Sequence, residues 1–301
     1  MDINTCNTHI IPCSFKYYRP TSIEEVLELL DKYGSDARLL AGGTDLLVSL
    51  KKREFCPKYI IDLKGINGIK GIETRDDGVY IGALTRLSDI ERNNVVRTRY
   101  TALYEAVWSM ASPQIRNKAT IGGNLCNASP AADTAPPLLV YNAKLVITSS
   151  NGDRVVDLKD FFRGPKKTIL APNELLTWII LPHPPKNHGS CFIKISRTAM
   201  DLAKASVAVK IVVSRDNIVE DIAVALGSVA PKPVRAASVE EALRGKVFSR
   251  GLVEEASRLV VEDISPITDI RSTAEYRRYI SVVITRDALL KAYERAVGGA
   301  K

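Results

Sequence analysis

Apolar residues recur along the chain at two spacings, one typical of helices and one typical of strands. A set at helical spacing follows Ser22, whose side chain can cap a helix start, and it ends at Gly34. The members of this set are Ile23, Val26, Leu27 and Leu30. Farther along, apolar runs at 37–40 and 59–63 flank a glycine turn and a helical pattern at 46–50. These segments predict a strand–helix–strand unit.

The rest of the chain predicts strands first, then helices, and strands again. The expected strands lie at 69–73, 79–83, 143–148, 155–158, 175–181, 191–196, 205–214 and 218–226. The expected helices lie at 87–93 and 101–110 and begin near Ser238 and Ser272. Residues 112–133 are small and polar without a single period, and loops of this length are usually functional.

A proline-rich segment at 182–189 can continue neither a strand nor a helix and is the best candidate for a domain boundary. It divides the chain into 1–185, with subdomains 1–64 and 65–185, and 190–301. The predicted fold class is α+β. A module of two α/β subdomains precedes a C-terminal α/β domain in which three strands form an antiparallel sheet.

Composition and charge narrow the class of protein. The 301 residues are 46% hydrophobic and 25% charged, which excludes disorder and fibres. A net charge of +8 is spread along the chain without a basic block, and only 6% of residues are aromatic, so nucleic acid is not an expected partner. A bound anion or an acidic partner subunit explains the surplus positive charge better than nucleic acid does.

The cysteines and the apolar runs indicate the compartment. The number of cysteines is odd, and none are spaced as CxxC, which argues against a disulfide framework, a zinc ribbon or an iron–sulfur cluster built by this chain. They are Cys6, Cys13, Cys56, Cys126 and Cys191. No stretch approaches the ~18 apolar residues of a membrane span, so we expect a cytoplasmic protein without such a span.

Two glycine pairs, Gly42-Gly43 and Gly122-Gly123, are the main candidates for chemistry. Glycine permits positive φ and close approach, so successive N–H groups can converge on phosphate oxygens. Either pair alone is more often a simple turn. Together they suit a pyrophosphate held from two sides and a polyol chain, with polar partners from Thr44, Thr120, Asn124, Asn127 and Asp133. Neither pair has Rossmann GxGxxG spacing or a P-loop lysine.

Segments 41–45, 120–124 and 128–133 closely resemble the two flavin-binding motifs of a known family. This family is the medium subunit of molybdenum hydroxylases, which includes xanthine dehydrogenase and aerobic carbon monoxide dehydrogenase. Residues 81–85 resemble its link between subdomains, and residues 269–278 resemble the signature of its C-terminal domain. The resemblance covers nearly the whole chain. It implies an FAD-binding module of the PCMH, vanillyl-alcohol-oxidase-like type.

The resemblance also implies which residues bind FAD. It places Leu176 and Lys194 against the flavin ring and makes Asp133 an acceptor of hydrogen bonds from flavin or ribityl groups. The full implied set is Leu40, Ala41, Gly42, Gly43, Thr44, Asp45, Leu46, Thr120, Ile121, Gly122, Gly123, Asn124, Asn127, Asp133, Leu176 and Lys194. Several other side chains have ordinary structural explanations: Trp108 and Trp178 as core residues, and His183 and His188 as surface residues.

The family's activity implies an electron-transfer oxidoreductase subunit. A large molybdopterin-binding subunit oxidises substrate, a small [2Fe–2S] subunit passes on the electrons, and FAD on this chain delivers them to NAD+ or another acceptor. No catalytic acid, nucleophile or metal is then expected here, because the cofactor carries the chemistry. Two alternatives remain: a self-contained FAD-dependent reductase of the cell-wall precursor type, and a noncatalytic nucleotide-binding module.

Overall fold

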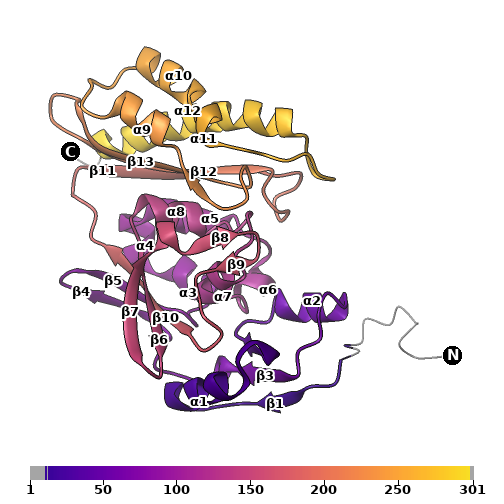
Figure 1. Ribbon diagram of the computed structural model, residues 1–301. Coiled ribbons are helices and arrows are strands. Elements are labelled where there is room, and N and C mark those ends of the chain that lie inside the picture. The colour runs from indigo at the N-terminus through magenta and orange to yellow at the C-terminus, as the bar shows by residue number, and fades with distance from the viewer. Residues whose placement is uncertain (1–10, 12, 299–301) are drawn as a thin grey trace.

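The computed structural model describes residue 11 and residues 13–298 (Figure 1). Three sheets of three or more strands succeed one another within residues 13–298, and Figure 1 shows the N-terminal sheet at one end and the C-terminal sheet near the other. No helix in the described part of the chain combines the length and apolar character needed to span a bilayer.

The N-terminal sheet is parallel, with strand order β1-β3-β2. Its elements are β1 (Lys16–Tyr18), α1 (Ile23–Tyr33), η2 (Gly34–Asp36), β2 (Ala37–Leu40), α2 (Leu46–Lys51), β3 (Tyr59–Asp62) and η3 (Leu63–Gly65). The Ser22 hydroxyl accepts a hydrogen bond from the Glu25 N–H, which confirms the predicted cap of α1. The β2–α2–β3 unit is the strand–helix–strand unit that the apolar pattern predicts.

The central sheet has five strands and is antiparallel, in the order β4-β5-β10-β6-β7. Its strands are β4 (Ile72–Arg75), β5 (Gly78–Gly82), β6 (Lys144–Ser149), β7 (Gly152–Asp157) and β10 (Leu175–Pro182). Between β5 and β6 the chain forms α3 (Leu87–Arg92), α4 (Asn94–Arg99), α5 (Thr101–Trp108), α6 (Pro113–Arg116), α7 (Ile121–Cys126) and α8 (Ala135–Val140). A short segment η4 (Leu158–Asp160) and the hairpin β8 (Phe162–Gly164) and β9 (Lys167–Thr168) complete this part.

The C-terminal sheet has four antiparallel strands rather than the three predicted. They are β11 (His188–Ile195), β12 (Ala205–Val213), β13 (Val219–Gly227) and the two-residue β14 (Val234–Arg235). The extra strand is too short to leave a pattern in the sequence. Four helices follow, namely α9 (Ala237–Leu243), α10 (Arg250–Arg258), α11 (Val260–Asp263) and α12 (Ala274–Gly298).

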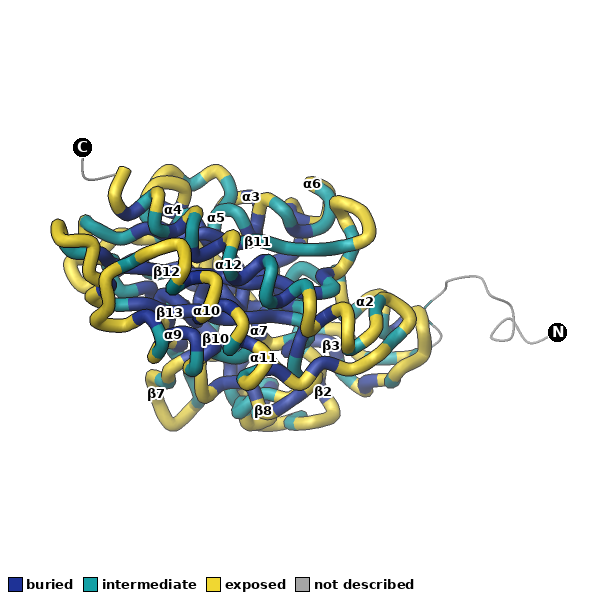
Figure 2. The backbone as a smooth tube through the Cα atoms, turned by 90° about the horizontal axis from the view of Figure 1, so that it is seen from above, coloured by how far each residue is buried: buried dark blue, intermediate teal, exposed yellow. Residues whose placement is uncertain are grey.

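Both faces of the C-terminal sheet are covered. Helix α12 packs on one face, and α5 and α8 from the preceding part pack on the other (Figure 1). All nine residues of β12 are consequently buried, and Figure 2 shows this part of the backbone in dark blue. A parallel strand or a strand covered on both faces reads as a continuous apolar run, as β12 does.

An ion-pair network joins the two sides of this sheet. The Glu105 carboxylate on α5 accepts hydrogen bonds from the Arg295 guanidinium on α12 at 2.6 Å and from the Phe192 N–H at 2.8 Å. Burial alone would raise the pKa of Glu105, but these donors hold it below its ordinary value. The side chain of Glu105 therefore remains a carboxylate that ties α12 to the rest of the chain.

Two expectations about individual side chains are wrong. Trp108 is 62% exposed at the end of α5 rather than part of the core. His188 is not a free surface residue, because its ring nitrogens lie 2.6 Å from the Pro185 carbonyl oxygen and 3.0 Å from that of Arg99. Burial lowers the pKa of His188.

The cysteines also depart from the prediction, because Cys13 and Cys56 form a disulfide with a Cα–Cα distance of 5.5 Å. The parallel pairing of β1 and β3 explains it. Lys16 is in register with Tyr59, and each cysteine lies three residues before its strand partner. The same register, continued backwards, brings the two cysteines together. Cys6 lies outside the described residues.

Candidate cofactor site

The first glycine loop, Ala41–Asp45, leaves the end of β2 and leads into α2. Gly43 has φ of +78°, a conformation that a side chain would strain. Within residues 13–298, the backbone N–H groups of Gly42, Gly43, Thr44 and Asp45 donate to no protein acceptor. Four successive donors without partners form a cradle suited to anionic oxygens.

The two glycine loops lie against each other. A Cβ on Gly42 would stand 2.2 Å from the Lys118 carbonyl oxygen, just before the second loop. A Cβ on Gly123 would lie 3.8 Å from the Cβ of Ala41. Only glycine at position 42 allows this approach. The fold therefore brings together the two segments that the sequence places about eighty residues apart.

The second loop differs from the expected anion cradle because it is helical. Thr120 caps α7, and its hydroxyl accepts a hydrogen bond from the Gly123 N–H at 3.1 Å. The N–H groups of Ile121 and Gly122 donate to the carbonyls of Thr85 and Ala83. These three N–H groups are thus paired within the protein, and a Cβ on Gly122 would stand 2.6 Å from the Cβ of Ala83.

A buried ion pair lies beyond α7. The Lys194 ammonium on β11 lies 2.7 Å from Oδ2 of Asp133, and both side chains are about 5% exposed or less. Lys194 Nζ also lies 3.4 Å from the Ser109 carbonyl oxygen. Burial raises the pKa of Asp133, and the Lys194 ammonium opposes that rise. The other carboxylate oxygen of Asp133, Oδ1, is buried without a hydrogen-bond partner.

An unpartnered acceptor in a buried position is costly and calls for a donor. Asp133 Oδ1 is therefore suited to a polar N–H or O–H group of a ligand. Together with the Gly42–Asp45 cradle, it gives the site anion-binding donors and a separate acceptor. FAD has both kinds of partner group, in its pyrophosphate and in its ribityl and ring atoms, so the residues present fit FAD.

Two asparagines are held by neighbours that sequence reasoning missed. The Thr134 hydroxyl donates to Asn124 Oδ1 at 2.6 Å, which leaves the Asn124 amide nitrogen as a donor. The Lys166 ammonium donates to Asn127 Oδ1 at 2.6 Å. Thr134 directly follows Asp133 and could have been suspected, but the sequence carries no sign of the contact made by Lys166.

The remaining predicted residues are apolar supports. Leu40 is 8% exposed at the end of β2, and Leu46 packs beside it as the first residue of α2. Leu176 on β10 is buried in the same core as Ile121 and Leu125 of α7. The structure thus places Leu176 beneath the helix that carries the second glycine pair.

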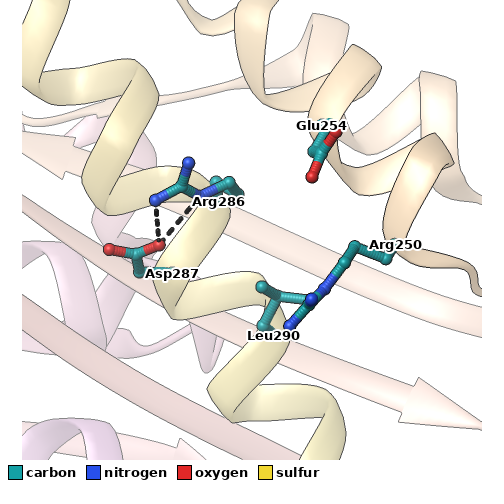
Figure 3. Close-up of a pocket in the computed structure, with 5 residues that line it drawn as sticks. All are labelled: Arg250, Glu254, Arg286, Asp287 and Leu290. Atoms are coloured by element: carbon teal, nitrogen blue, oxygen red, sulfur yellow. Dashed lines mark hydrogen bonds and ion pairs between the residues drawn. The ribbon is translucent and has the colours of Figure 1, made fainter.

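A hollow elsewhere does not belong to this site. It lies between α10 and α12 and is lined by Arg250, Glu254, Arg286, Asp287 and Leu290 (Figure 3). Arg286 pairs with its neighbour Asp287, and both side chains are more than 40% exposed. The C-terminal sheet separates these helices from the glycine loops (Figure 1).

Comparison with known families agrees with this geometry. Residues 13–184 match the FAD binding domain in molybdopterin dehydrogenase, and residues 190–292 match the CO dehydrogenase flavoprotein C-terminal domain. The chain is thus an FAD-binding oxidoreductase subunit. It belongs to the family of FAD-binding medium subunits of molybdenum hydroxylases.

Relatives match along nearly their whole length. The glyceraldehyde dehydrogenase medium chain of Sulfolobus acidocaldarius is 38% identical, over 92% of this chain and 98% of the relative. The xanthine dehydrogenase FAD-binding subunit of Escherichia coli O157:H7 is 33% identical, over 94% and 97%. In a solved carbon monoxide dehydrogenase from Hydrogenophaga pseudoflava, the matching chain is 35% identical with a TM-score of 0.92, over 95% and 99%.

Proposed function

We propose that this chain passes electrons from the [2Fe–2S] clusters of a small partner subunit, through its FAD, to NAD+ or another acceptor. A large molybdopterin-binding subunit would oxidise the substrate and supply the electrons. A cytoplasmic location is part of the proposal. The names of the relatives, medium chains and FAD-binding subunits of several dehydrogenases, support an assembly of this kind.

The observation that carries the proposal is a set of uncommitted polar groups where the two glycine loops meet. The N–H groups from Gly42 to Asp45 would donate to the pyrophosphate oxygens. The Thr44 hydroxyl and the Asn124 amide would add donors along the polyol chain. Asp133 Oδ1 would accept a hydrogen bond from a flavin or ribityl group.

Lys194 would hold Asp133 in place as a positioning residue. Its ammonium neutralises the carboxylate in a buried site and fixes the side chain through Oδ2, so that Oδ1 points elsewhere. In the proposal Lys194 and Leu176 also lie near the flavin ring. Bound FAD supplies the redox chemistry, while this chain supplies position and electrostatics.

The test is purification of the native complex from its host. We expect a large molybdenum-binding chain and a small [2Fe–2S] chain to accompany this one, with one FAD per chain released by acid. Substrate-dependent reduction of NAD+ would identify the acceptor, and reduction of an artificial dye alone would point to a different acceptor. Recovery of the chain alone, fully active with NADPH and a small molecule, would overturn the proposal in favour of a self-contained reductase.

A further inference from the structure

The Cys13–Cys56 disulfide is close in the chain to the helix that follows the first glycine loop. Cys56 comes five residues after the end of α2, and Cys13 comes three residues before the start of β1. The loop Ala41–Asp45 in turn leads directly into α2. One covalent bond therefore links the segment before β1 to the helix that begins where the backbone cradle ends.

Helix α2 covers a small apolar cluster, which lies apart from the one that packs on α1. Among the described residues, the cluster under α2 has three buried apolar side chains, whereas the one on α1 has ten. The three are Leu40, Leu50 and Ile60. The partly buried side chains that pack around them are Ile11, Phe15, Leu46 and Phe55. A core of this size supplies little stability by itself, and small cores commonly depend on a covalent link.

The disulfide holds the cover of this cluster in place. Phe15 belongs to the segment that Cys13 anchors, and Phe55 is the residue before Cys56. The pairing of β1 with β3 begins at Lys16, so it does not extend to Phe15. Opening the disulfide would therefore release the chain on both sides of the cluster, and a segment with few buried contacts opens locally at low cost.

The same cluster supports the cradle at both of its ends. Leu40 is the last residue of β2, Leu46 is the first residue of α2, and the residues between them are the first glycine loop. Loss of packing at these two leucines would loosen the backbone donors from Gly42 to Asp45. The redox state of the disulfide is thus coupled to the geometry of the cofactor site through a few apolar contacts.

The position of the disulfide also allows another thiol to react with it. Cys56 is exposed and Cys13 is half-buried, so an incoming thiolate can reach Sγ of Cys56 more easily than that of Cys13. Accessible disulfides undergo exchange with thiolates, whereas buried ones are protected. In the cytoplasm, the location proposed above, disulfides are usually transient or redox-sensing.

We propose that Cys13 and Cys56 form a thiol–disulfide exchange site that controls how tightly the chain holds FAD. The reductant is a dithiol, and the disulfide form binds FAD more tightly than the dithiol form. The site acts on cofactor binding by this chain alone, so it does not depend on the partner subunits or on the electron acceptor.

The exchange proceeds in two displacements. A thiolate of the dithiol attacks Sγ of Cys56 and forms a mixed disulfide, while the bond to Cys13 breaks and the Cys13 thiolate takes up a proton. The second thiolate of the dithiol then attacks its own sulfur partner in the mixed disulfide and releases Cys56 as a thiolate, which also takes up a proton. Two electrons pass to this chain, which gains two thiols as the dithiol becomes a disulfide.

The first test compares FAD binding by the full-length chain before and after treatment with dithiothreitol. Thiol titration should show two additional thiols per chain, and quenching of flavin fluorescence should show an affinity weaker by at least about fivefold. The variant Cys13→Ser/Cys56→Ser should bind FAD as weakly as the reduced chain and should not respond to dithiothreitol. Cys191→Ala, at a buried free thiol on β11, is the matched control and should respond as the unmodified chain does.

The second test uses the reciprocity of coupled equilibria. Saturating FAD should shift the disulfide–dithiol equilibrium toward the disulfide by the same factor by which reduction weakens FAD binding. Mixtures of reduced and oxidised dithiothreitol, followed by alkylation and mass spectrometry, measure this shift. No shift would show that the disulfide acts on stability without acting on the cradle, and the inference would then fail.

Amide hydrogen exchange separates a local effect from a global one. Reduction should speed exchange at 42–51 and leave the buried strand β12 unchanged. Faster exchange in β12 as well would mean that reduction loosens the whole chain, which would overturn the inference. Equal FAD affinity of the oxidised and reduced chains would overturn it too, as would a response of Cys13→Ser/Cys56→Ser to dithiothreitol.

Discussion

Replacing Gly42 with alanine tests whether the close contact between the two glycine loops holds the cofactor. The added Cβ would stand 2.2 Å from the Lys118 carbonyl oxygen and 2.9 Å from the Ala119 Cα. Ordinary contact begins near 3.4 Å, so the loops would have to separate by about 1.2 Å. Both neighbours are backbone atoms, which cannot rotate away as a side chain would.

Overpacking of this kind costs about 1–3 kcal/mol. If the loops separate to relieve the contact, the cradle opens, and the cost appears in FAD binding as a roughly 5- to 150-fold weaker affinity. We expect Gly42→Ala to fold, because the first loop, residues 41–45, is only partly buried and can shift without disturbing a core. Its far-ultraviolet circular dichroism should match that of the unmodified chain.

The assay is titration of FAD-free protein with FAD, followed by the quenching of flavin fluorescence. Gly68→Ala is a matched control, because a Cβ at Gly68 would meet nothing within 4 Å and its φ is not positive. If Gly42→Ala binds FAD as tightly as Gly68→Ala, the contact between the loops does not hold the cofactor, and the reasoning is refuted.

Three further predictions concern stability. Asp133→Asn removes the carboxylate charge that neutralises the buried Lys194 ammonium and should lower the free energy of unfolding by about 3–5 kcal/mol. A second substitution, Lys194→Met, should recover much of that loss in urea denaturation, and no recovery would contradict the pairing. The Cys13–Cys56 disulfide spans 43 residues and should contribute about 4 kcal/mol, so dithiothreitol should lower the urea midpoint of the unmodified chain but not that of Cys13→Ser. The pKa of Glu105 in the folded chain lies below its ordinary value of 4.5, so its stabilising contribution is full at neutral pH and is lost as the pH falls through the folded pKa. The variant Glu105→Gln should therefore flatten the fall in melting temperature below pH 4.5. An unchanged profile would exclude Glu105 as a source of the acid sensitivity.

Local patterns in the sequence predict much of the fold. The strand–helix–strand unit emerges because short apolar runs and one glycine turn determine it locally, and strand β2 spans the predicted residues 37–40. The resemblance to a known family adds the location of the cofactor motifs. The fourth C-terminal strand, only two residues long, is beyond what a pattern can show.

Long-range contacts explain what the sequence could not show. The second glycine pair looks like a loop because two glycines disfavour a helix. It becomes helical because carbonyls of Ala83 and Thr85, almost forty residues away, accept its first N–H groups. Likewise, the buried pairing of Lys194 with Asp133 across 61 residues depends on where β11 lies. No local feature of either residue predicts that distance.

The central claim is that the first glycine loop, and not the second, supplies backbone donors to FAD. Amide hydrogen exchange of the chain with and without FAD, followed by mass spectrometry of overlapping peptides, tests it directly. We predict that FAD strongly slows exchange at 42–45, where the N–H groups are free, and changes little at 121–123, where they already bond to protein. Protection at 121–123 with none at 42–45 would contradict the account.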